Sequence, residues 1–101
     1  MAGPLERLEA WYAAQCDGDW EHSFGVTIES LDNPGWRFRI DLEGTALAGK
    51  PFDRVDERNG DADWLVCWVD AAAFNAACGP RQLTLALERF LDWAEVAGGA
   101  G

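Results

Sequence analysis

Apolar side chains recur at helical spacing near the amino-terminal end of the chain. Leu5, Leu8 and Tyr12 follow one another at intervals of three and four residues. Pro4 precedes them and suits the first turn of a helix, where its missing N–H costs nothing. We expect this helix to end near residues 17–18, because a glycine there can adopt the left-handed conformation that closes a helix.

A second helical pattern occupies the carboxyl-terminal part of the chain, after a Gly-Pro pair at residues 79–80. Its apolar positions form a continuous stripe that would face the interior of the protein. The stripe comprises Leu83, Leu87, Phe90 and Ala94, and it is widened by Ala86, Leu91 and Trp93. We expect the glycine-alanine tail at residues 97–101 to fray.

Between the two helices, apolar and polar residues alternate as they do in strands with one buried face. One alternating run precedes the turn DNPGW at residues 32–36, and another follows it from Trp36 to Leu42. Pairing their apolar rows would place Glu29 beside Arg37 on the other face. We therefore predict a hairpin, with Pro34 and Gly35 at the centre of a type II turn.

The remaining apolar run is WLVCWV at residues 64–69, which is apolar on both faces and indicates a central or thoroughly covered strand. Residues 52–58 form a weaker, charged pattern that is typical of a sheet edge, and Asn59-Gly60 ends it with a turn. Residues 71–78 fit either helix or loop. The sequence predicts an α+β fold: a four-stranded, mainly antiparallel sheet with the amino- and carboxyl-terminal helices packed on one face.

Composition indicates one folded domain over residues 1–101 that is unsuited to nucleic acid or membranes. Hydrophobic residues make up 49%, with six tryptophans and five phenylalanines, while the formal net charge is −10. This charge repels phosphate backbones and anionic lipids. No secretory signal or spanning segment is visible, so we expect a cytoplasmic protein. Three cysteines without paired spacing argue against disulfides and a zinc site.

The richest candidate chemistry lies in WYAAQCDGDWEH at residues 11–22. Its carboxylates would attract a basic partner, and its aromatic rings would anchor that partner. The same residues also suit a structural role, in which the aspartates bond to backbone groups of a turn and the tryptophan closes the core. With the nearby turn at residues 32–36, the candidate partner-binding residues are Tyr12, Asp17, Asp19, Trp20, Glu21, His22, Asp32 and Asn33.

The same segment also suits two other chemistries. The carboxylates and His22 could hold a divalent cation, but their spacing lacks the length of an EF-hand and the chain has no second histidine. Cys16 could act as a nucleophile with His22, in a small enzyme or ligand-binding pocket roofed by Trp11 and Trp20. Two acids follow Cys16, which disfavours its thiolate. Neither partner binding nor a structural role of this segment requires a cofactor.

Two features outside that segment also leave alternatives open. The acidic group at residues 53–63 fits a solvated sheet edge, or the rim of a partner interface. Cys67 lies in an apolar run and Cys78 beside a glycine, so both suit the packing of a core.

Several motifs together resemble the immunity protein 53 family, which comprises bacterial proteins encoded beside polymorphic toxins. The motifs are WY-x-x-QCDGDWEH, DNPGW, IDLEGT at residues 40–45 and WLVCWVD, followed by the Gly-Pro pair and the last helix. The resemblance implies a non-enzymatic protein that binds and neutralises a cognate toxin. Combined with the negative charge, it suggests occlusion of a basic toxin surface, such as that of a nuclease. It identifies neither the toxin nor the oligomeric state.

Overall fold

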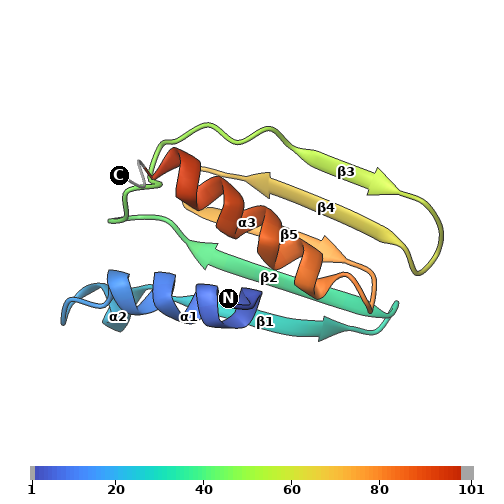
Figure 1. The fold of residues 1–101 in the computed structure, drawn as a ribbon, viewed down its shortest axis with the longest axis horizontal. Helices are drawn as coiled ribbons and strands as arrows, with labels where there is room; N and C mark the ends of the chain where they lie inside the picture. Colours follow the sequence, from blue (N-terminus) through green and yellow to red (C-terminus); the bar gives the residue numbers. More distant parts are fainter. Residues whose placement is uncertain (1, 99–101) are drawn as a thin grey trace.

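The computed structural model describes residues 2–98, which form three helices and five strands in an α+β arrangement (Figure 1). The predicted fraying of residues 97–101 concerns mostly residues outside the described part. Within that part, Ala97 is the last residue of the carboxyl-terminal helix. The elements in chain order are α1 (Pro4–Gln15), α2 (Trp20–Ser23), β1 (Val26–Leu31), β2 (Gly35–Asp41), β3 (Val55–Arg58), β4 (Trp64–Val69), β5 (Ala73–Cys78) and α3 (Leu83–Ala97).

The sheet is antiparallel and has the strand order β1-β2-β5-β4-β3, so its central strand is β5. The prediction of four strands is therefore corrected to five. The added strand is β5, which lies within residues 71–78, the segment expected to be helix or loop. Its sequence AFNAAC does not alternate clearly, because small residues occupy both faces of a strand buried between two neighbours. Strand β4 is internal, as expected, and β3 is an edge.

The hairpin of β1 and β2 has the predicted register, in which Glu29 pairs with Arg37 and Thr27 with Arg39. The Arg37 Nη1 and Glu29 Oε1 atoms are 3.9 Å apart. The type II turn was wrong, because Gly35 lacks the positive φ that this turn requires and instead begins β2. A glycine is needed there because a Cβ atom would overlap the carbonyl oxygen of Cys78 in β5.

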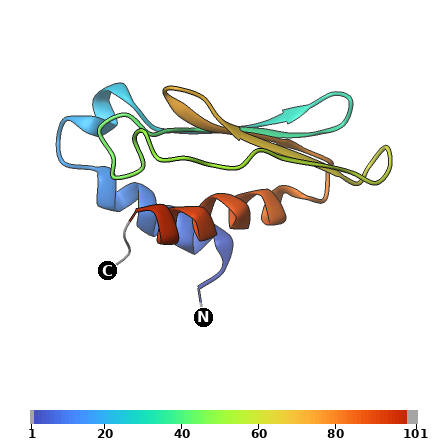
Figure 2. The same ribbon diagram turned by 90° about the horizontal axis from the view of Figure 1, so that it is seen from above.

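Helices α1 and α3 both pack on one face of the sheet, as the sequence predicted, and neither covers the other face (Figure 2). The short helix α2 lies at one end of the sheet (Figure 1). The core fills the space between these layers, and its largest fully buried side chains include Phe38, Phe74 and Phe90. The two helices also contact each other. The Arg7 guanidinium lies 3.1 Å from carboxylate oxygens of Asp92 and Glu95, which joins α1 to α3.

The connections between elements gather at two opposite ends of the sheet (Figure 1). The α1–α2 connection and the loop after β2 lie at one end, whereas the β1–β2 and β3–β4 turns lie at the other. Within residues 2–98, no helix has the length and apolar character needed to cross a membrane.

Candidate functional site

The acidic connection between α1 and α2 is built by its own carboxylates. Asp17 Oδ1 accepts hydrogen bonds from the N–H groups of Asp19 and Trp20, both at 2.9 Å. The Glu21 carboxylate reaches back and accepts from the N–H groups of Asp17 and Gly18 at 3.0 Å. Gly18 has a φ of +97°, so a glycine is favoured at this position. The bonds from Trp20 and Asp19 lower the pKa of Asp17, since they favour its charged form.

The structural interpretation of this segment is therefore confirmed for Asp17, which bonds to the turn backbone, and for Trp20, which is buried. It is wrong for Asp19, and Glu21 plays the backbone-bonding role that the sequence assigned to that aspartate. The carboxylates of Asp17 and Glu21 nevertheless remain at the surface, because Asp17 is exposed and Glu21 is only half-buried. Asp19 and His22 are also exposed, and neither side chain makes a hydrogen bond to a described residue. The acidic connection therefore exposes negative charge, and the Asp19 carboxylate makes no hydrogen bond within the described structure.

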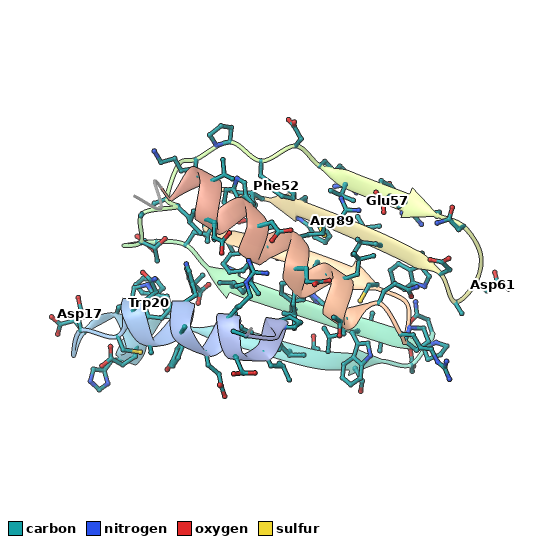
Figure 3. The ribbon with its side chains drawn as sticks, in the orientation of Figure 1. Asp17, Trp20, Phe52, Glu57, Asp61 and Arg89 are labelled. Carbon is teal, nitrogen blue, oxygen red and sulfur yellow. The ribbon has the colours of Figure 1, made fainter. Side chains whose placement is uncertain are left out.

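Trp20 does not belong to this exposed surface, which corrects its expected role as a partner anchor. Only 6% of the residue is exposed, and its indole N–H donates to the carbonyl oxygen of Glu43 at 2.8 Å. Its ring meets Trp11 and Tyr12 edge to face, with centroids 6.2 and 6.0 Å apart. Trp20 therefore ties the short helix α2 to the loop after β2 and to α1, at one end of the molecule (Figure 3).

Tyr12 is the aromatic candidate that remains accessible, with 38% of the residue exposed. Its ring centroid lies 6.0 Å from that of Trp20, the first residue of α2. The neighbouring Cys16 side chain contributes most to raising the pKa of Tyr12, and the charge of Glu21 contributes least. Tyr12 therefore lies beside the acidic connection rather than at a separate site.

Asp32 and Asn33 lie away from these residues, because β1 carries the chain from α2 to the far end of the sheet (Figure 1). Asn33 instead lines a pocket of about 370 Å³ together with Arg58, Gly60, Asp61 and Trp64 of the β3–β4 turn region. The eight candidates thus do not form one surface. Nearby, the Trp36 indole N–H donates to the carbonyl oxygen of Pro80, as expected of a structural tryptophan.

Two of the three cysteines are core residues, and the third bonds to the backbone. The Cys16 thiol donates to the backbone carbonyl of Tyr12 at 3.3 Å, and no hydrogen bond joins it to His22 in the described part of the chain. Cys67 and Cys78 are buried, and burial raises their pKa values to about 12 and about 11. Among residues 2–98, no group of three or more histidine, cysteine or acidic side chains is placed to hold a metal ion.

A groove beside the acidic connection was missed by the sequence interpretation. It has a volume of about 410 Å³, it lies between α1 and β1, and Tyr12 belongs to both features. Leu5 is 61% exposed here, although its helical spacing predicted burial. The sequence signal for this groove was the broad apolar face of α1, which includes Trp11 and Tyr12 as well as Leu5 and Leu8. The sheet covers only part of that face, so Leu5 and Tyr12 remain exposed. The groove is lined by Leu5, Leu8, Glu9, Tyr12, Gly25 and Val26.

Charge is distributed unevenly around this part of the molecule. Residues 8–36, which build most of α1, the acidic connection, α2 and β1, contain six acids and no lysine or arginine. One arginine of β2 and one of β3 lie beside an acid, and the arginine that precedes β3 lies over an aromatic ring. Arg39 Nε lies 3.3 Å from Asp41, Arg58 Nε lies 2.7 Å from Asp56, and Arg54 stacks 5.5 Å from the Trp68 ring centroid. Residues 8–36 are therefore the longest stretch of the sequence without lysine or arginine, although Arg37 of β2 lies 3.9 Å from Glu29.

Comparison with known proteins supports the resemblance seen in the sequence motifs. The family model described as immunity protein 53 matches residues 5–95, which include every described helix and strand except the first residue of α1 and the last two of α3. Neither the curated proteins nor the solved structures yielded a match. The match covers most of the chain, and the chain therefore belongs to the immunity protein 53 family.

Proposed function

We propose that this chain is a cytoplasmic, non-catalytic immunity protein that binds a cognate toxin of a polymorphic toxin system and blocks it. The observation that carries the proposal is the family match over residues 5–95. An immunity protein acts by occupying its toxin, so its function depends on an accessible surface rather than on a reactive pocket.

The surface that we propose for the toxin is the acidic side formed by α1, the α1–α2 connection and α2. Asp19 and His22 are exposed and unused by the fold, while Asp17 and Glu21 add charge close by. Tyr12 supplies an accessible aromatic ring, a residue type common at the energetic centre of interfaces. Charge of one sign accelerates encounter with a partner of opposite sign. We therefore propose occlusion of a basic toxin surface, such as that of a nuclease.

The experiment is co-expression with the toxin encoded next to this gene, read out by growth rescue and by pull-down. Association kinetics of the purified pair then locate the interface. Asp19→Lys reverses an exposed charge at the proposed surface, and Asp61→Lys makes the same change at the opposite end of the molecule (Figure 3). We expect Asp19→Lys to slow association about tenfold at low salt, with little effect from Asp61→Lys.

The results separate the function from its placement. Absence of rescue and of binding would refute the toxin-neutralising function for that pair. Binding and rescue that survive Asp19→Lys with unchanged salt dependence would leave the function standing and move the interface elsewhere.

A further inference from the structure

Strand β1 has a free edge. Among the described residues it pairs only with β2, which leaves one side of its backbone without a strand partner. The N–H of Asp41 donates to the carbonyl oxygen of Gly25 at 3.0 Å, one position before the strand begins. Because bonded and non-bonded pairs alternate in an antiparallel ladder, the backbone groups of Val26, Ile28 and Ser30 point to the open edge.

The two edge strands, β1 and β3, differ in how they are protected against the addition of another strand. Strand β3 has four residues, three of them charged, and the Arg89 guanidinium of α3 lies 3.1 Å from its Glu57 carboxylate (Figure 3). Short length and charge are common ways to keep other strands from adding to an edge. Strand β1 has six residues, with Glu29 as its one charged residue and no proline or lysine. The edge at β1 therefore lacks these protections.

The apolar groove follows the same edge. The face of β1 that carries Val26 and Ile28 is the face on which α1 packs, and Val26 lines the groove with Leu8 and Tyr12. Leu5, Tyr12 and Ile28 are 61%, 38% and 38% exposed, which leaves three large apolar side chains at this edge incompletely covered. A strand added to β1 would place every second side chain against these residues.

We infer that β1 and the α1–β1 groove accept an extended segment of the toxin as a sixth strand of the sheet. This inference rests on the proposed function and specifies how the partner docks. The segment would carry apolar side chains toward the groove and basic side chains near Glu9 and Glu29. A second copy of this chain fits less well, because a symmetric contact would bring Glu9 and Glu29 of one copy toward the same acidic edge of the other.

The first test compares two variants at the middle of β1, using the toxin domain encoded next to this gene as the probe. Ile28→Pro removes an N–H that the β1–β2 ladder does not use, so an edge strand should tolerate it. Ile28→Ala removes the same side chain but keeps the N–H. We expect Ile28→Pro to bind the toxin domain at least tenfold more weakly than Ile28→Ala does. Equal affinities for the two folded variants would overturn strand addition.

The second test is amide hydrogen exchange of the unaltered protein, which does not depend on the folding of a variant. The amides of Val26, Ile28 and Ser30 should exchange rapidly in the free protein and at least tenfold more slowly with the toxin domain bound. Binding without such protection would overturn the inference while the neutralising function stands. Protection that rises with the concentration of this chain alone would identify a second copy as the occupant and also overturn it. Failure of the toxin domain to bind would refute the proposed function, and strand addition with it.

Discussion

Replacing Trp20 with phenylalanine separates its role in the core from a role in binding. The sequence placed Trp20 among the anchors of an interface, whereas the structure buries it at the start of α2. Phenylalanine keeps an aromatic ring but loses the indole N–H that donates to the Glu43 carbonyl at 2.8 Å. The perturbation therefore removes one hydrogen bond and part of a packed ring without introducing a polar or charged group.

The magnitude follows from these contacts. A net hydrogen bond contributes about 1 kcal/mol, and an edge-to-face aromatic contact contributes about 0.5–1.5 kcal/mol. Trp20 makes such contacts with Trp11 and Tyr12, and the smaller ring would keep only part of them. We expect the free energy of unfolding to fall by about 2 kcal/mol. For a domain of this size, that corresponds to a decrease in Tm of about 10 °C.

The assay is urea unfolding followed by far-ultraviolet circular dichroism, together with toxin affinity measured under conditions in which the variant is folded. Trp68→Phe is the control, because Trp68 is half-buried and stacks with Arg54, so its loss should cost less than about 1 kcal/mol. Affinity of the folded Trp20→Phe variant should stay within about twofold of the unaltered protein, a change of less than about 0.5 kcal/mol. Unchanged stability with strongly weakened binding would show that Trp20 is an interface anchor and not a core residue.

Three further outcomes are expected. Asp17→Ala should destabilise the protein at neutral pH, and the difference should disappear in acid. The folded-state pKa of Asp17 is lowered, so its contribution is present above the unfolded pKa of about 3.9 and is lost as pH falls through the folded value; urea midpoints at several pH values check this. Gly35→Ala should lower the free energy of unfolding by about 2 kcal/mol through overlap with Cys78, whereas Gly60→Ala, in open space, should change it by less than about 0.5 kcal/mol. Thermal melts of both variants would show equal effects if the close approach at Gly35 were absent. Iodoacetamide should leave Cys67 and Cys78 unmodified until the protein unfolds, because both are buried and have raised pKa values. Mass spectrometry of the native protein would contradict this if it found either residue alkylated, and His22→Ala should not change the rate at Cys16.

The candidate surface could be predicted from the sequence only in part. The segment at residues 11–22 was correctly identified as an unusual acidic and aromatic cluster, because composition is visible without a fold. The sequence did not show which of its residues are structural and which remain exposed to solvent. Asp17 and Glu21 both bond to nearby backbone and remain at the surface, so the structural role does not remove their charge from solvent. Their contact with a partner stays a prediction. Asp32 lies far from them because a single strand separates it from α2.

The groove could not be located from the sequence, since it depends on how closely α1 packs against the edge strand β1. Leu5 and Leu8 share one helical stripe, yet Leu8 is buried and Leu5 is largely exposed. Periodicity reports which face of a helix is apolar. It does not report whether another element covers the whole length of that face.

The sequence by itself determined the two long helices, the β1–β2 hairpin with its register, and the strand at residues 64–69. These features arise from side chains a few residues apart, whose spacing matches the helical or strand period. Only the tertiary structure decided that β5 is the central strand, that Trp20 is buried, and that β1 is the unprotected edge. Each of these depends on contacts between segments distant in the chain, as when Gly35 meets Cys78 or Trp20 meets Glu43. Local pattern fixes which surfaces are apolar, but packing decides which of them remain open to a partner.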